Sequence, residues 1–251
     1  MDEKTLLTKD SINSEDVIGF YDTYAEHWDK RFRHTKSTQR FHQIRLETFL
    51  RLAKLKKYEV AIELGVGTGQ YLDKIASLVK EIICIDGSQK MLGILLKNNK
   101  HLNNITVRRM NLEEEDQAIR VKSDIIYCFG LIEHIINTNI FIENCKRMLN
   151  SNGRIIFVTP NGKCPWYGKL RKLFRSGKHC STDRYYYKEQ IDKIMCQYGF
   201  VSQDFIYWGY YPAGIGNLLF YLLDWLGKNL DKTRFRQYAG GLTVSYILKR
   251  E

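Results

Sequence analysis

The chain has 251 residues, of which 44% are hydrophobic and 27% charged, so it is long enough for one large globular domain. No run of about 18 apolar residues occurs and the start of the chain is polar, so we expect neither a membrane-spanning helix nor a signal peptide. The formal net charge of +11 suits an anionic partner or simply keeps the protein in solution. The six scattered cysteines form no C-x-x-C pair, which argues against a metal site and favours reduced thiols in a cytoplasmic protein.

Residues 1–55 contain two predicted amphipathic helices, over 14–30 and 37–52. Ser14 is the expected N-cap of the first helix. Its aromatic residues recur at helical spacing and include Tyr21, Tyr24 and Trp28. Such a stripe either packs into a core or covers a bound ligand.

Residues 58–160 alternate between apolar strands and helices. We predict strands over 58–64, 81–85, 105–109, 124–129 and 154–159, and helices over 70–79, 88–100 and 137–149. Strands that are apolar throughout indicate a parallel sheet covered on both faces. Beyond residue 182 we expect a helix over 187–198, a strand over 200–207, a helix over 217–226 and a final strand over 242–248.

A glycine turn follows the first strand, with glycines at 65, 67 and 69. Glycine permits positive φ and close approach of a ligand, and the helix after the turn favours negative groups at its N-terminus. Gln70 stands where a dinucleotide fingerprint would have its last glycine, and no P-loop lysine follows, so the spacing departs from both patterns. The pattern alone could still be only a tight turn.

An acidic residue, Asp86, ends the next strand. Its carboxylate could accept both hydroxyls of a ribose, or it could cap the helix that begins near Ser88. Because Ser88 is itself a good N-cap, the sequence favours Asp86 as a ligand-binding residue.

With these segments, the chain resembles the class I S-adenosylmethionine methyltransferases. The resemblance covers about residues 20–200 and is closest to the branch of ubiquinone- and menaquinone-biosynthesis methyltransferases. It rests on the segments 20–29, 61–69, 85–92, 124–135 and 147–161, which read FYDTYAEHWD, AIELGVGTG, IDGSQKML, DIIYCFGLIEHI and RMLNSNGRIIFVTPN.

The resemblance implies a Rossmann-like, doubly wound sheet of seven strands in the order 3-2-1-4-5-7-6, with strand 7 antiparallel. It implies one methyltransferase domain over 1–251, with lid helices in 1–55, a cofactor-binding core in 58–160 and substrate-side insertions at 161–182 and 208–240. It also implies that the cofactor is S-adenosylmethionine and that the cofactor product is S-adenosylhomocysteine.

The residues implied to bind the cofactor are Tyr21, Glu63, Gly65, Gly67, Thr68, Gly69, Asp86, Gly87, Ser88, Met91, Asn111, Leu112, Phe129 and Gly130. The family more often has aspartate where Asn111 stands. The amide oxygen of asparagine can still accept a hydrogen bond from the adenine amino group.

His134 lies just past the fourth strand, at the edge where ligands bind, and titrates near neutrality. It is therefore the candidate general base for a hydroxyl acceptor, or else a residue that only orients its loop. The candidate substrate-binding residues are Tyr24, Trp28, His134, Trp166, Tyr207 and Tyr211.

The acceptor is predicted from two regions after Pro160. Residues 161–182 mix lysine and arginine with aromatic side chains and contain no acidic residue, and residues 205–226 are strongly apolar and aromatic. This composition favours a small apolar or lipid-linked acceptor that a peripheral protein reaches at an anionic membrane surface. Methylation on oxygen is what the resemblance to the quinone-biosynthesis O-methyltransferases implies. The apolar stretch could instead be a buried helix or a contact in a homodimer. RNA methylation is the alternative function, because basic and aromatic side chains also suit nucleic acid.

Overall fold

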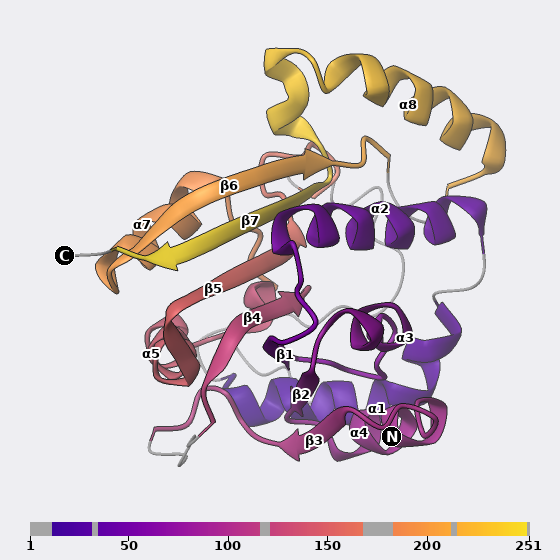
Figure 1. The fold of residues 1–251 in the computed structure, drawn as a ribbon. Helices are drawn as coiled ribbons and strands as arrows, with labels where there is room; N and C mark the ends of the chain where they lie inside the picture. Colours follow the sequence, from indigo (N-terminus) through magenta and orange to yellow (C-terminus); the bar gives the residue numbers. More distant parts are fainter. Residues whose placement is uncertain (1–11, 32–34, 116–120, 168–182, 212–214, 250–251) are drawn as a thin grey trace.

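The computed structural model describes residues 12–31, 35–115, 121–167, 183–211 and 215–249. Seven strands form one sheet in the order β3-β2-β1-β4-β5-β7-β6 (Figure 1). The strands are β1 Val60–Leu64, β2 Glu81–Asp86, β3 Ile105–Arg109, β4 Ser123–Phe129, β5 Leu149–Pro160, β6 Phe200–Trp208 and β7 Gly241–Leu248. β7 is antiparallel to both of its neighbours, and the other pairs are parallel. The expected order and the antiparallel seventh strand are confirmed.

Helices cover both faces of the sheet. The longer helices are α1 Ser14–Arg31, α2 Lys36–Ala53, α4 Gln89–Asn98, α5 Thr138–Met148, α7 Lys188–Gln197 and α8 Asn217–Leu230. Shorter turns are α3 Leu72–Ile75, η1 Ala76–Leu78, η2 Ile132–His134 and η3 Arg234–Tyr238. Buried side chains of α2, α3 and α4 share one core cluster, and those of α5 and α7 share the other. No described helix is long and apolar enough to cross a membrane.

The strands are apolar on both sides because each side meets helices. In β1, Ala61 packs into the cluster with α2 and Ile62 into the cluster with α5. Successive side chains of a strand point to opposite faces, so burial on both faces needs an unbroken apolar run.

The first residues of α1 and α4 are set by side-chain hydrogen bonds to backbone N–H groups. Asn13 caps α1, since its Oδ1 accepts from the Asp16 N–H at 3.0 Å and Asp16 Oδ2 accepts from the Asn13 N–H at 2.9 Å. The predicted cap, Ser14, is therefore wrong by one residue, because the reciprocal pair forms at Asn13. The Ser88 cap is confirmed: its Oγ accepts from the Met91 N–H at 3.1 Å.

Replacing Ser88 by alanine should lower the free energy of unfolding by about 0.5–2 kcal/mol, the usual cost of losing an N-cap. Ser88 Oγ also donates to Asp22 Oδ1 at 2.7 Å, so the change loosens α1 as well. Urea unfolding of S88A measures the effect, with S77A, at an exposed serine of η1, as the control. Equal midpoints for the two variants would show that the cap contributes nothing.

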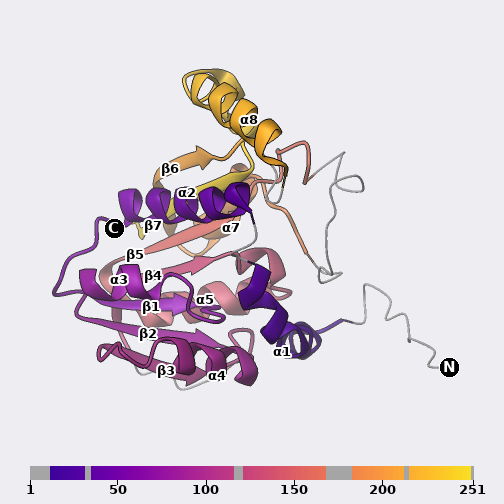
Figure 2. The same cartoon turned by 90° about the vertical axis from the view of Figure 1, so that its right-hand side faces the viewer.

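The carboxyl ends of β1, β2 and β4 lie side by side. Leu64 pairs with Ile85 on one side and Cys128 on the other. The turns that follow these strands therefore meet at one edge of the sheet, where ligands bind in doubly wound folds. Figure 2 shows α1 beside this sheet, at the end away from α8.

Candidate active site

A pocket lies at this edge, between α1, α2, η2 and the turns after β1, β2 and β4. Its empty volume is about 980 Å³, part of it open to solvent, which is at the upper end of the range for small-molecule sites. The cofactor residues implied by the resemblance that line it are Tyr21, Glu63, Gly65, Gly67, Asp86, Gly87, Met91, Asn111, Leu112, Phe129 and Gly130. Residues far apart in the chain are thus brought together.

The glycine turn has positive φ at all three glycines, 62°, 56° and 77°. A Cβ on Gly65 would lie 2.7 Å from Leu131, and one on Gly69 would lie 2.8 Å from Asn99. The space at Gly67 is open apart from Trp28 Nε1 at 3.7 Å. Gly65 and Gly69 are therefore required by packing, whereas Gly67 leaves its side of the turn accessible to a ligand.

Asp86 holds the glycine turn in place. Its Oδ2 accepts from the Gly67 N–H at 2.8 Å and its Oδ1 from the Ser88 N–H at 2.9 Å. Burial raises the pKa of Asp86, while these backbone hydrogen bonds oppose the shift. The expectation that Asp86 is left free by the Ser88 cap is incomplete, because both carboxylate oxygens already accept. Each oxygen can accept more than one hydrogen bond, so capacity toward the pocket remains.

Helix α1 forms one wall of the pocket. Asp22 accepts from the Lys90 N–H at 3.0 Å and from Ser88 Oγ, which lowers the pKa of Asp22. Asn111 Nδ2 donates to Glu15 Oε1 at 2.9 Å and to Ser14 Oγ at 3.0 Å. Aspartate could not donate these bonds, so the asparagine at this position ties α1 to the turn after β3.

His134 is held between two other side chains. Its Nε2 lies 2.9 Å from the Tyr21 hydroxyl and its Nδ1 lies 2.9 Å from Asp183 Oδ1. The side chain of Asp183 is only 2% exposed. Burial tends to lower the pKa of His134, but the Asp183 hydrogen bond and the charges of Glu133 and Asp183 outweigh it, so the pKa is raised.

Sequence reasoning missed Asp183 altogether. It lies 49 positions beyond His134, and no local pattern connects the two. The Arg184 N–H donates to the Glu133 carbonyl at 2.8 Å, which fixes the backbone beside η2 and brings Asp183 under the imidazole.

Arg45 was also missed. It reaches the pocket from α2, with its guanidinium carbon 5.6 Å from the centre of the Phe129 ring. A Cβ on Gly130 would lie 2.5 Å from Arg45 Nη2, so glycine at this position makes room for the arginine. In the sequence Arg45 was one polar residue of an amphipathic helix, without a motif of its own.

Glu63 lies beneath the glycine turn, as expected. It accepts from the Tyr127 hydroxyl at 3.1 Å, and burial raises the pKa of Glu63 to about 8. At neutral pH this carboxyl is therefore mostly protonated.

Several predicted site residues lie away from the described lining of the pocket. Thr68 and Ser88 are buried, and Gly69 packs against Asn99. Tyr24 stacks on Phe20, with ring centres 5.8 Å apart.

Of the candidate substrate-binding residues, some line the pocket and others lie away from it. Trp28 and His134 line the pocket. Tyr207 packs against Phe205, with ring centres 5.5 Å apart, and Tyr211 packs edge-on against Phe220 at 4.9 Å. Trp166 Nε1 is buried near Gly240. Most of the basic segment 161–182 lies outside the described residues, which stop at 167 and resume at 183.

Comparison with known proteins identifies the class. A family model described as a methyltransferase domain matches residues 33–203. The chain belongs to this family. It is a class I S-adenosylmethionine-dependent methyltransferase, related to the ubiquinone branch.

Two curated relatives illustrate the relationship. The ubiquinone biosynthesis O-methyltransferase of Bradyrhizobium diazoefficiens is 25% identical over 165 residues, covering 60% of this chain and 63% of the relative. That of Coxiella burnetii is 24% identical over 159 residues, covering 62% and 65%. The match therefore spans less than two thirds of the length of either relative.

Solved structures share the fold. The magnesium protoporphyrin IX methyltransferase of Synechocystis PCC 6803, determined with bound S-adenosylhomocysteine, aligns with a TM-score of 0.64 at 13% identity. The alignment covers 95% of this chain and 100% of that one. At this identity the likeness concerns the fold alone.

An unpaired buried amide supports the fit of a polar ligand in the pocket. Gln70 lines the pocket, and its Nε2 is buried with no hydrogen-bond partner among the described residues. A buried donor without a partner is costly, and a ligand oxygen would satisfy it.

Replacing Gln70 by methionine should therefore weaken S-adenosylmethionine binding about fivefold, the value of one hydrogen bond near 1 kcal/mol. The free protein should melt at the same or a slightly higher temperature, because no existing bond is lost. Calorimetry and thermal melting test the two effects. Unchanged affinity would show that Gln70 does not contact the cofactor.

Proposed function

We propose that this methyltransferase transfers the methyl group to an oxygen of a small apolar or lipid-linked acceptor, with His134 as general base. The observation that carries the proposal is the hydrogen-bonded chain from Tyr21 through His134 to Asp183. Methylation of a hydroxyl requires loss of its proton, and a positioned imidazole is suited to accept it.

The pocket offers groups for each part of the cofactor. Asp86 suits the ribose hydroxyls, and the open side of Gly67 suits close approach of the methionine portion. Arg45 and Gln70 suit its carboxylate, since a guanidinium and an amide both donate to carboxylate oxygens. Met91, among the apolar lining residues, suits the adenosine. When bound, the cofactor supplies a methyl group on a positively charged sulfur, which needs little further activation.

His134 is prepared to receive a hydroxyl. Asp183 accepts from Nδ1, which leaves Nε2 as the atom that faces the pocket and accepts a proton. In this structure the Tyr21 phenol lies at Nε2. An acceptor hydroxyl that replaced it would meet the same nitrogen at hydrogen-bond distance and would give up its proton to it.

The acceptor is inferred from the described lining, which is mainly apolar and aromatic and also carries Arg45 and the carboxyl groups of Glu63, Asp86 and Glu113. The printed names of the curated relatives, ubiquinone biosynthesis O-methyltransferases, support oxygen as the methylated atom. We include in the proposal that the protein works in the cytoplasm at an anionic membrane surface, as a monomer or homodimer. RNA methylation is not retained, because no described pocket feature favours it.

A panel of acceptors tests the proposal. Phenols with short and long alkyl chains, the corresponding anilines and structured RNA are incubated with S-adenosylmethionine, and S-adenosylhomocysteine is quantified. We expect turnover of the phenols, increasing with chain length. Turnover confined to the anilines or to RNA would contradict oxygen transfer to an apolar acceptor.

A further inference from the structure

Helix α8 exposes a broad apolar face. Six large apolar side chains of this helix are between 39% and 90% exposed: Leu218, Leu219, Tyr221, Leu222, Trp225 and Leu226. At 3.6 residues per turn they occupy an arc of about 160° around the helix axis. A contiguous patch of this kind marks an interaction site far more often than scattered single residues do.

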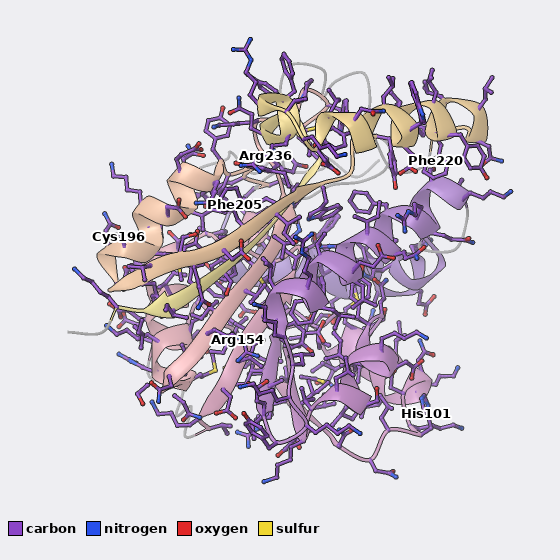
Figure 3. The ribbon with its side chains drawn as sticks, turned by 45° about the horizontal axis from the view of Figure 1, so that its top comes forward. His101, Arg154, Cys196, Phe205, Phe220 and Arg236 are labelled. Carbon is purple, nitrogen blue, oxygen red and sulfur yellow. The ribbon has the colours of Figure 1, made fainter. Side chains whose placement is uncertain are left out.

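The opposite face of α8 is packed, so the apolar face is fixed toward solvent. Phe220 is 5% exposed and lies on the side of α8 toward the body of the protein (Figure 3). Gly227 lies against the Tyr210 ring, where a Cβ would come within 2.5 Å of Cδ2. The Tyr210 hydroxyl donates to Asp231 at 2.7 Å, and Ser37 of α2 donates to the Ile215 carbonyl at 3.0 Å. These contacts set the rotation of the helix.

The segment that follows α8 in the chain is rich in exposed basic and aromatic side chains. Lys232, Arg234 and Arg236 are exposed there, as are Phe235 and Tyr238. We call these residues, together with the six of α8, the α8–η3 surface. An apolar helix face bordered by cations and aromatic rings is typical of segments that lie in the headgroup region of a bilayer.

A lipid bilayer fits this surface better than a second copy does. In a two-fold contact each patch meets its own copy, so the basic residues of both chains would be gathered into one interface. The net charge of +11 adds to that repulsion. Anionic headgroups instead complement the cations, while the aliphatic side chains enter the acyl region.

We propose that the α8–η3 surface docks the enzyme on anionic bilayers. This deepens the proposed function and rests on it for the apolar acceptor. β6 runs parallel to β1 and β4 through their shared neighbours, so its end at Trp208 lies at the pocket edge of the sheet. The chain leaves this edge to form α8, and Figures 1 and 2 show α8 as the outermost helix there. A bilayer bound to α8 would therefore lie at the edge of the sheet that also holds the pocket.

Vesicle flotation of the full chain tests the docking surface. We expect binding to vesicles of phosphatidylcholine with phosphatidylglycerol and much weaker binding to phosphatidylcholine alone. L222E/W225E should lower the partition coefficient about tenfold or more. K232E/R234E should act only on anionic vesicles, since each basic side chain contributes about a fivefold gain in partition near such a surface. L96E and K97E are the matched controls on α4, where Leu96 is 52% exposed, and should bind as the wild type does.

The outcomes are distinct. Absence of wild-type binding, or equal binding by L222E/W225E, would overturn the proposal. A wild-type dimer that L222E/W225E converts to a monomer, seen by light scattering, would assign the surface to a second copy instead. Turnover of a short-chain soluble phenol should be unchanged in L222E/W225E, with loss only for an acceptor held in vesicles. If the wild type binds vesicles but methylates neither phenol, the docking surface stands and the proposed oxygen transfer fails.

Discussion

Replacing His134 by alanine is expected to lower kcat for a hydroxyl acceptor by about 10²–10⁴-fold, the usual contribution of a general base. Affinity for S-adenosylmethionine should change little, because His134 is not among the groups proposed to hold the cofactor. Single-turnover rates at saturating cofactor, with calorimetric binding alongside, separate the two effects. A His134→Ala enzyme with the wild-type rate would leave the residue a role only in shaping its loop.

The pH dependence gives a second readout. The rate should fall as the pH drops through the raised pKa of His134, because the imidazolium cannot accept a proton. In Asp183→Asn the carboxylate that raises this pKa is absent while burial still opposes the charge, so the acid limb of the profile should move to lower pH. The rate on the plateau should also fall, because the imidazole loses the partner that orients it. An unshifted limb in Asp183→Asn would contradict the positioning role of Asp183.

Asp86→Ala is the change expected to affect cofactor binding most. It removes the carboxylate that is proposed to accept hydrogen bonds from the ribose hydroxyls. It also removes the acceptor of the Gly67 and Ser88 N–H groups, and these two hydrogen bonds hold the glycine turn in place. Hydrogen bonds to a charged group are worth about 1.5–3 kcal/mol, so S-adenosylmethionine affinity should fall by at least that amount.

Calorimetry measures this loss, and urea unfolding without ligand measures the damage to the turn itself. Asp86→Asn keeps the shape but places an NH₂ group against a backbone N–H, so it should also bind weakly. Asp204→Ala, at an exposed carboxylate of β6, is the control and should bind normally. Wild-type affinity in Asp86→Ala would exclude Asp86 from the cofactor site.

The fold was predictable because its signals are local. Each strand is a short apolar run in the sequence. Capping residues and glycines mark where the helix after each strand begins. The resemblance then supplied the order of the strands. The cap at Asn13 escaped because two adjacent polar residues can both serve, and only the hydrogen bonding distinguishes them.

The site residues that lie within one sequence motif were predictable. The site residues that tertiary packing brings together from distant elements were not. The glycine turn and Asp86 lie on one continuous segment. Asp183 and Arg45 reach the pocket from distant elements, and no spacing connects them with His134 or Phe129.

Helix α8 shows a different limit. Its composition fits a buried helix and an exposed one equally well, since apolar residues occupy most positions. Only the packing of Phe220 and Gly227 decides which side faces the protein and leaves the leucines and Trp225 outside.

The most direct test of the central claim is the fate of an isotopically labelled methyl group. Labelled S-adenosylmethionine is incubated with an acceptor that carries both a phenolic hydroxyl and an amine, and the product is read by NMR. We expect the label on oxygen with the wild type and almost no transfer with His134→Ala. Label on nitrogen or carbon, or equal transfer to oxygen by both enzymes, would contradict a base-assisted O-methyl transfer at this site.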